Sequence, residues 1–344
     1  MRDQPDNAPF NILVTAASRR VPLVREFRRV LAETGLAGRV VVTDVNKLSP
    51  AIHAADCAYR VPLSTDPDYL DVIEALVVAE RIDLLVPTID DELPIFAEAR
   101  DRFTRHGAFV AVSGGRTTEI CNDKYEACRV LRSRGVAAAA SYLPGELPRQ
   151  PQFPLFIKPR FGRGSVGAFP VHSPLHLEFF VSYVTDPVLQ EFLHGPEFTI
   201  DVFCDTEGRA ISVVPRQRVV IRSGVIDRGC TSADPALMDL ALQCVEAIPF
   251  IGPINIQCRV VDGRPTVFEI NPRFSGGIPL TIAAGADFPR MLVDLARGRR
   301  MEPVIGQFTP NLWMTSYESS FFVEQDRIES LLKEVPAFDE VGSR

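Results

Sequence analysis

The chain has 344 residues, of which 46% are hydrophobic and 24% are charged, and its formal net charge is −7. This length allows two or three domains with their own cores, and the acidic balance excludes a general affinity for nucleic acids or membrane surfaces. No apolar run approaches the roughly 20 residues of a membrane-spanning helix. The seven cysteines include no Cys-x-x-Cys pair and the N-terminus has no signal-peptide pattern, so we expect a cytoplasmic protein with reduced thiols.

Strand and helix patterns alternate in the first third of the chain. Strands are predicted at residues 10–14, 39–44, 82–87 and 109–112, and helices at 22–33 and 68–80. Acidic residues at 90–92 indicate another helix start, because acids favour the N-terminal end of the helix dipole. This alternation predicts a Rossmann-like α/β domain with a parallel sheet over residues 1–115.

A domain of this kind raises the alternative of a nicotinamide-dependent oxidoreductase. The turn after the first strand, residues 15–20, has the sequence Thr-Ala-Ala-Ser-Arg-Arg and lacks the Gly-x-Gly-x-x-Gly fingerprint. Asp44 ends the second strand, where a ribose-binding acid would stand. Without the glycines, however, a pyrophosphate cannot approach the backbone closely, and this alternative fails.

From about residue 116 the pattern changes to a phosphate-binding one. Residues 118–134 are predicted to form one helix that carries Lys124. A proline-rich link then leads to a strand that ends in Lys158, and the glycine-rich loop 161–167 follows. Glycines let backbone N–H groups wrap a phosphate, and a lysine adds a point charge. By itself this loop is as readily a flexible turn, and it is not a Walker loop.

Further strands are predicted at residues 188–192, 197–203 and 211–219, a helix at 236–248, and a β-hairpin at 252–271 with its turn at 261–263. Glu269 and Asn271 are two residues apart and share a face, and their hard oxygen atoms suit Mg²⁺. Gln257 faces either Glu269 or Asn271 across the hairpin, as a third ligand or as a core amide. Arg273 extends this polar face if the strand geometry persists past Pro272; the alternative is a strand end with a polar face.

In this order, the two lysines, the glycine loop and the hairpin resemble the ATP-grasp superfamily, in its carbamoyl-phosphate-synthase-like and carboxylate–amine ligase branch. The resemblance covers residues 10 to about 300. It implies an α/β protein with a Rossmann-like pre-ATP-grasp domain at 1–115 and a two-subdomain ATP-grasp fold. The lid or small subdomain is expected at 116–192, and the large subdomain with the C-terminal tail at 193–344.

The resemblance also implies a role for each matching residue. The catalytic residues would be Arg273, which stabilises the transferred phosphoryl group, and Lys158, with Lys124 and Lys158 on the α- and β-phosphates. The other nucleotide contacts would be Gly162, Gly164, Ser165 and Gly167 in the lid loop, Gln190, Glu191 and Phe192 beside adenine, and Glu197 on the ribose. One or two Mg²⁺ ions, or Mn²⁺, would be held by Gln257, Glu269 and Asn271. From the residues we add Arg216, which belongs to a cluster with Arg218, Arg222 and Arg228. One or two of these clamp the substrate carboxylate or the γ-phosphate, or they form a solvated strand edge.

The activity implied is an ATP-dependent ligase that joins a carboxylate to an amine through an acyl phosphate. Its partners would be small-molecule carboxylate and amine substrates, with a homodimer left open. Carbamoyl phosphate synthesis is not expected, because the chain has one such unit rather than two. The alternative is an ATP-binding regulatory or interaction module without ligase activity.

Overall fold

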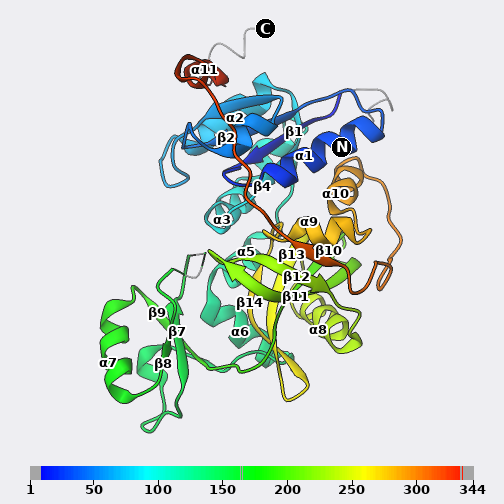
Figure 1. Cartoon of the computed structure of the whole chain (residues 1–344). Coiled ribbons are helices and arrows are strands. Elements are labelled where there is room, and N and C mark those ends of the chain that lie inside the picture. The colour runs from blue at the N-terminus through cyan, green and yellow to red at the C-terminus, as the bar shows by residue number, and fades with distance from the viewer. Residues whose placement is uncertain (1–8, 163, 165, 334, 336–344) are drawn as a thin grey trace. The chain divides into compact units, whose positions relative to one another are not determined.

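The computed structural model describes residues 9–162, 164, 166–333 and 335, and the chain divides into two compact units (Figure 1). The first unit holds the described residues up to Val112, Asp287–Met301 and the described residues from Tyr317 onward. The second unit holds Ser113–Ala286 and Glu302–Ser316. None of the described helices has both the length and the apolar character of a membrane-spanning segment.

A parallel sheet forms the centre of the first unit. Its strand order is β16-β3-β2-β1-β4-β5, and neighbouring strands pair in parallel. Every residue of β1 and β2 is buried, as expected for a parallel sheet covered on both faces. The predicted α/β class is therefore confirmed. The strands are β1 (Asn11–Thr15), β2 (Val40–Asp44), β3 (Cys57–Arg60), β4 (Ile82–Pro87), β5 (Phe109–Val110) and β16 (Leu332–Lys333).

Helices from both ends of the chain cover this sheet. They are α1 (Val21–Glu33), η1 (Pro50–Ala54), α2 (Tyr69–Ala79), η2 (Asp90–Glu92), α3 (Leu93–Glu98), α4 (Arg100–Thr104), α10 (Phe288–Ala296) and α11 (Gln325–Leu331). Helix α10 packs against α1 and β4, and Arg29 of α1 forms a 2.7 Å ion pair with Asp287. The region predicted as one subdomain, 193–344, is thus shared between the two units, because α10 buries its apolar side against the first.

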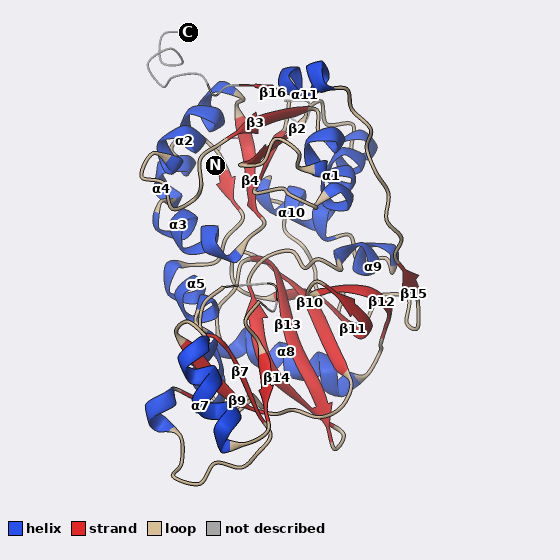
Figure 2. Ribbon diagram, turned by 60° about the vertical axis from the view of Figure 1, so that its left-hand side comes forward, coloured by secondary structure: helices blue, strands red, loops and turns tan. Residues whose placement is uncertain are grey.

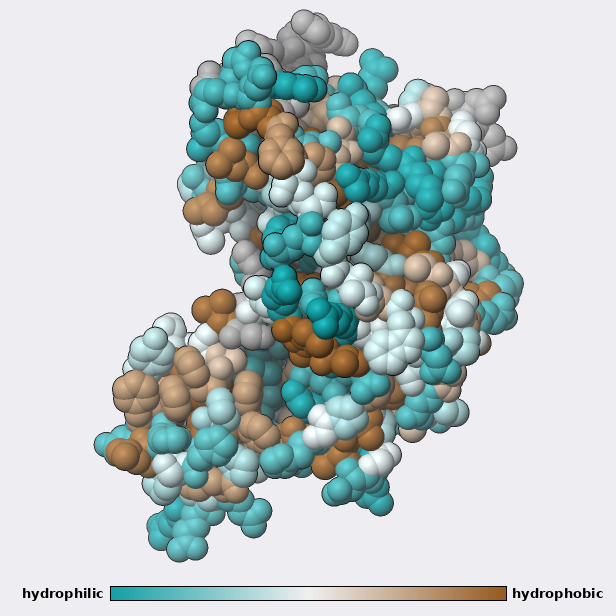
Figure 3. Space-filling view, in the orientation of Figure 1, coloured by the Kyte–Doolittle hydropathy of each residue, from teal (hydrophilic) through white to brown (hydrophobic). Residues whose placement is uncertain are grey.

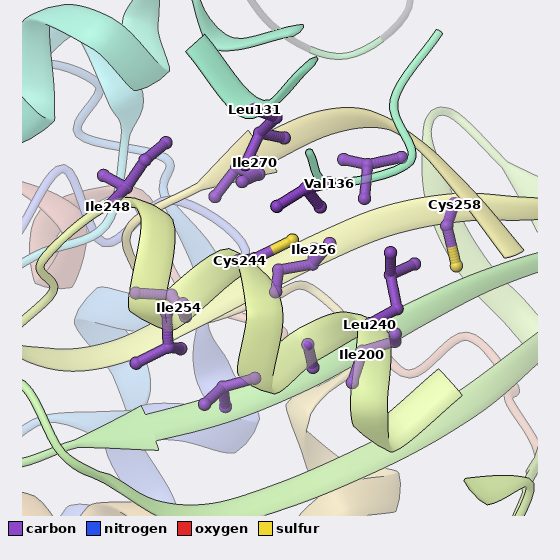
Figure 4. Packing of buried hydrophobic residues seen from close by; sticks show 14 of the residues in the cluster. Leu131, Val136, Ile200, Leu240, Cys244, Ile248, Ile254, Ile256, Cys258 and Ile270 are labelled. Carbon is purple, nitrogen blue, oxygen red and sulfur yellow. The ribbon is translucent and has the colours of Figure 1, made fainter. Parts of the chain in front are cut away.

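A six-stranded antiparallel sheet dominates the second unit, with the order β14-β13-β10-β11-β12-β15 (Figure 2). One face packs on helices, and Figure 4 shows Ile200, Ile254 and Ile256 of the sheet close to Leu240 and Cys244 of the covering helix α8. The elements of this layer pair are β10 (Glu197–Cys204), β11 (Ala210–Arg222), β12 (Val225–Thr231), β13 (Gly252–Val261), β14 (Arg264–Asn271), β15 (Trp313–Thr315), α5 (Gly115–Asn122), α6 (Lys124–Ser133), α8 (Pro235–Ala247) and α9 (Ile278–Ala283).

A small four-stranded sheet completes the second unit, in the order β6-β9-β7-β8. The strands are β6 (Ser141–Tyr142), β7 (Leu155–Pro159), β8 (Phe169–Val171) and β9 (Pro187–Glu191), and the helices between them are η3 (Pro144–Glu146) and α7 (Pro174–Tyr183). Its core is small and is centred on Leu155, Ile157 and Leu189. Helix α7 has no buried residue, and apolar side chains gather on the surface over it (Figure 3).

One sequence-based prediction about an element is wrong, and the error has a local cause. The helix predicted at 118–134 is two helices, because Asp123 has φ −95° and ψ 102° and its side chain caps α6. The C-terminal tail adds the last strand of the large sheet, since Trp313 of β15 pairs with Cys230.

Candidate functional site

The second face of the large antiparallel sheet carries polar side chains along the length of its strands. In β10, Phe198, Ile200 and Val202 join the apolar cluster, so the alternating Glu197 and Asp201 face the other way. Corresponding positions on the neighbouring strands are also polar. We call this the polar face, and its members are Glu197, Thr199, Asp201, Arg216, Arg218, Asn255, Gln257, Arg259, Glu269 and Asn271.

The three predicted metal ligands lie together on the polar face. Gln257 pairs with Glu269, and Asn255 pairs with Asn271, which decides the register that the sequence left open. Asn271 donates from Nδ2 to Glu269 Oε1 at 3.1 Å. One carboxylate and two amide oxygens suit Mg²⁺, which commonly takes its remaining ligands from water and substrate phosphates. Among the described residues, no group of three or more His, Cys, Asp and Glu could hold a metal ion instead.

A β-bulge in β14 creates this arrangement. Cys258 pairs with Val267 and Gln257 pairs with Glu269, so Phe268 is an extra residue without a partner on β13. In regular pairing Glu269 would lie opposite Ile256 and face the apolar core. The bulge also leaves the Phe268 carbonyl available, and it accepts hydrogen bonds from Lys158 Nζ at 3.2 Å and from Gln190 Nε2 at 3.4 Å.

Lys158 reaches the bulge from the small sheet, near the end of β7. Its Nζ lies 3.9 Å from Glu269 Oε2 and 5.3 Å from the centre of the Phe268 ring. Only 7% of its side chain is exposed. Burial lowers the pKa of this ammonium group below its ordinary value, whereas the Glu269 carboxylate acts to raise the pKa. A buried cation beside one carboxylate is a suitable contact for an anionic ligand.

Lys124 is placed by a cap that sequence reasoning missed. Asp123 accepts hydrogen bonds from the backbone N–H groups of the first turn of α6, and its carboxylate forms a bidentate pair with Arg160 at 2.9 and 2.6 Å. The backbone N–H of Lys124 donates to the Arg160 carbonyl at 3.1 Å, and its Nζ donates to the Gly162 carbonyl at 2.5 Å. The helix start is thereby fixed to the beginning of the glycine-rich loop.

The glycine-rich loop has the backbone conformation that its composition requires. Gly162, Gly164 and Gly167 have φ values of 99°, 73° and 71°, in the region that favours glycine. Ser165, predicted as a further phosphate contact, lies outside the described residues. The structure therefore places Lys124 and Lys158 beside or near a loop with left-handed glycines, and the phosphate-binding role stays a prediction.

The segment predicted to lie beside adenine forms the end of β9. Gln190 is buried, and its Nε2 also donates to Ser141 Oγ at 3.0 Å. The Glu191 side chain accepts from Ala140 N at 2.7 Å, so its carboxylate fixes the small sheet's edge. The Phe192 ring lies 6.2 Å from Phe156. These side chains are engaged within the small sheet, and the place of Gln190, Glu191 and Phe192 beside adenine stays a prediction.

Glu197, predicted to hold a ribose, lies between two arginines. Its Oε1 accepts from Arg218 Nη1 at 2.6 Å, and its Oε2 accepts from Arg259 Nη2 at 2.5 Å. Arg218 also donates to Gln257 Oε1 at 3.3 Å and to the Gly224 carbonyl at 2.6 Å. Burial lowers the pKa of Arg218 from its ordinary value, and the charge of Glu197 opposes that shift. Neither arginine pair was specified by the sequence patterns.

Arg273 follows the end of β14, so the strand geometry does not persist past Pro272. The backbone N–H of Arg273 donates to the Asn271 carbonyl at 2.9 Å, and its Nη2 lies 3.4 Å from Asn271 Oδ1. The guanidinium is therefore beside a predicted metal ligand although the strand has ended. Its second contact is to the Phe274 carbonyl at 3.1 Å.

Arg216, the third residue predicted as catalytic, is buried within the sheet. It forms a bidentate ion pair with Asp201 at 2.8 and 2.9 Å and donates to Ser275 Oγ at 2.9 Å. Both side chains are 1% exposed. Gly277 is packed against Arg216, since an added Cβ would lie 2.3 Å from Nη1. Arg222 and Arg228 differ from it: both are largely exposed and lie 3.9 and 3.8 Å from Asp227.

Two family models match parts of this chain. Residues 12–111 match the model of a PylC-like N-terminal domain, and residues 184–317 match a model described as ATP-grasp in the biosynthetic pathway with Ter operon. Carbamoyl phosphate synthase large chains from Clavibacter michiganensis and Clavibacter sepedonicus are each 25% identical in an alignment 318 residues long that covers 82% of this chain. The match covers 28% of each relative, so the chain spans little more than a quarter of their length.

Solved structures of the same fold come from several enzymes. A biotin carboxylase from Campylobacter jejuni, in complex with an ATP analogue, superposes with a TM-score of 0.71 at 17% identity, over 88% of this chain and 74% of that one. An L-amino acid ligase from Bacillus licheniformis gives 0.68 at 19% identity, over 88% and 77%. The biotin carboxylase domain dimer of a Hydrogenobacter thermophilus carboxylase, in complex with MgADP and bicarbonate, gives 0.68 at 17% identity, over 88% and 73%.

Proposed function

Since this chain is a member of the ATP-grasp superfamily, we propose that it is an ATP-dependent, ADP-forming ligase that joins a carboxylate to an amine. The observation that carries the proposal is the bulged strand β14. The bulge sets Glu269 opposite Gln257, and the Phe268 carbonyl accepts a hydrogen bond from Lys158 and holds it beside Glu269. Oxygen donors and a buried cation at one place are what a magnesium-bound polyphosphate requires.

The predicted roles fit this geometry. Gln257, Glu269 and Asn271 would hold one or two Mg²⁺ ions, which would neutralise charge on the phosphates. Lys124, Lys158 and the glycine-rich loop would bind the α- and β-phosphates, and Arg273 would stabilise the transferred phosphoryl group. Glu197 would bind the ribose, and the backbone of Gln190, Glu191 and Phe192 would line the base. Buried Arg216 would act by supporting the Ser275–Gly277 turn, through its 2.9 Å bond to Ser275.

The chemistry requires positioning and charge more than a nucleophilic side chain. A substrate carboxylate oxygen attacks the γ-phosphorus, the bond to the bridging β–γ oxygen breaks, and ADP leaves. The amine then attacks the carbonyl carbon of the acyl phosphate, loses a proton, and phosphate departs with the electrons of the carbon–oxygen bond. Water would hydrolyse this intermediate, so a loop that covers the phosphates has a clear use.

We propose a carboxyl group as the phosphoryl acceptor, and two structures of the same fold carry names of compatible chemistry. One is named an L-amino acid ligase, another a biotin carboxylase crystallised with an ATP analogue. The whole of a carbamoyl phosphate synthase is not proposed, because this chain spans little more than a quarter of such a relative. We propose small-molecule carboxylate and amine substrates, bound from solution.

Thermal unfolding of the full chain tests the nucleotide part of this proposal. Mg²⁺-ATP at about a hundred times its dissociation constant should add about 2.7 kcal/mol of stability to the unit that binds it. Chelation of the metal should reduce this gain, and NAD should give none. A pairwise screen of carboxylates and amines for ADP release would then identify the substrates. ATP binding without ADP release for any pair would favour the regulatory module, and stabilisation by NAD alone would contradict the proposal.

A further inference from the structure

We propose that Arg218 is the arginine of β11 that contacts the polyphosphate of the nucleotide. The inference rests on the proposed function and adds one residue to its binding site. Arg216 and Arg218 are two residues apart on the same face of one strand, so their sequence positions favour neither. Their partners distinguish them.

Arg216 is committed to the protein itself. Nε and Nη2 share both oxygens of Asp201, and Nη2 also donates to Ser275. Thr281 Oγ1 completes the environment of Asp201 at 2.5 Å. Gly277 packs directly on Nη1, which is buried and has no hydrogen-bond partner among the described residues. Moving Arg216 toward a nucleotide would leave Asp201 as a buried charge without its ion-pair partner, which is costly.

Arg218 instead points its guanidinium toward the predicted metal ligands. Its Nη1 lies 3.3 Å from Gln257 Oε1, and the charge of Glu269 is among those that act on it. When Gln257 Oε1 binds a cation, it becomes a poorer hydrogen-bond acceptor for Arg218. The phosphate oxygens that accompany such a cation are the natural replacement, because guanidinium groups bind phosphates with two parallel hydrogen bonds.

The local charge balance supports the same ligand. Among the described residues, Glu197 is the carboxylate ion-paired with both Arg218 and Arg259, at 2.6 and 2.5 Å, so two guanidinium groups share one carboxylate. With Lys158 matched by Glu269, this end of the polar face has an excess of one positive charge. An anionic ligand would balance the excess, and Arg259 would keep Glu197 paired when Arg218 turns to it.

Titration calorimetry on the full chain tests the assignment, with Mg²⁺-ATP and Mg²⁺-2′-deoxy-ATP as ligands. Arg218→Met should weaken both nucleotides by about tenfold to a hundredfold, since it removes a charge-assisted contact. The ratio of the two affinities should stay as in the wild type. Arg218→Lys should recover part of the loss, because it restores the charge without the planar fork.

Arg264→Met is the matched control, because Arg264 is an exposed arginine at the start of β14 that does not belong to the polar face. It should change either affinity by no more than about threefold. Wild-type affinity in Arg218→Met would overturn the assignment. So would a loss confined to ATP, since that would place the contact at the ribose.

Three cases keep the outcome decisive. If Arg218→Met does not fold, as judged by its unfolding transition without nucleotide, an undiminished affinity in Arg218→Lys would overturn the assignment. If the wild type itself does not bind Mg²⁺-ATP, the proposed function fails and this inference fails with it. If the wild type binds and Arg218→Met binds equally well, only the role of Arg218 is refuted.

Discussion

In the parallel sheet of the first unit polar groups gather where strands end, whereas in the antiparallel sheet of the second unit they follow one face along the length of the strands. At the end of β1, Ser18 N donates to Asp44 Oδ2 at 2.7 Å and Thr15 Oγ1 donates to Glu92 at 2.7 Å. In β10 of the other sheet, Glu197 and Asp201 alternate with core residues.

This difference shows where each sheet can hold functional charged side chains. Helices cover both faces of a parallel sheet, so a charge in mid-strand would be buried without a partner. An antiparallel sheet packed on one face can carry charges on the other, on backbone fixed by two neighbouring strands. Asp44 illustrates the first case, because its carboxylate is occupied by the turn that follows β1.

The largest expected effect is on the polar face, from Glu269→Gln. Loss of a carboxylate ligand should slow ADP release with an identified substrate pair on the order of a thousandfold or more, because several kcal/mol of transition-state stabilisation disappear. ATP affinity should also become insensitive to a chelator. Glu246→Gln, an exposed change on α8, is the control and should leave both quantities unchanged. Normal turnover in Glu269→Gln would sink the metal assignment.

The next effect concerns the ion pair that the polar face buries most deeply. Arg216→Met should lower the free energy of unfolding of the second unit by about 3–5 kcal/mol, because Asp201 stays buried without its partner. Urea denaturation measures this. The double variant Arg216→Met with Asp201→Leu should recover part of the loss, and exposed Arg222→Met should change stability by less than about 0.5 kcal/mol. A stable Arg216→Met protein with an unchanged transition would contradict the comparison drawn above.

A smaller effect of a different origin is expected in mid-strand of the parallel sheet. Leu13 of β1 is fully buried, and Leu13→Ala should cost about 2–5 kcal/mol of unfolding free energy through lost packing and a cavity. Leu48→Ala, at an exposed position, is the matched control and should cost less than about 0.5 kcal/mol. Nucleotide affinity, measured on the same samples, should not change. A neutral Leu13→Ala would mean that this sheet is not packed on both faces.

Much of this architecture could be predicted because its patterns are local. Alternation around the Asp262–Gly263 turn predicts the β13–β14 hairpin, and both turn residues do have positive φ values, 47° and 76°. The confirmed class of the first domain came from buried apolar runs such as Val40–Asp44. The division of 193–344 between two units was not predictable, because it depends on packing of α10 against residues far away in the sequence.

The candidate site was harder to predict where long-range partners decide a role. Helical periodicity continues through Asp123, and the local signal of an N-cap, Asp123 with Glu126 three residues later, was missed; the tertiary pair with Arg160 fixes the cap further. Arg216 and Arg218 are the same residue type on the same face of β11. Their partners distinguish them, Asp201 for Arg216 and Gln257 for Arg218. The register of Gln257 against Glu269 depends on an extra residue, Phe268, that no turn or composition signal marks.

The extra residue Phe268 reverses the face of the sheet to which the following residues of β14 point. Side chains of a strand alternate between the two faces of the sheet. In β14, every residue after Phe268 lies on the face opposite to the one that regular alternation from Val267 would give it. A deletion at Phe268 would let Val267 and Glu269 alternate regularly, so Glu269 and Asn271 would keep their face of the sheet. What such a deletion removes is the Phe268 carbonyl, which accepts from Lys158 and Gln190, so a hairpin without the extra residue could present the same polar face but could not hold Lys158 in this way.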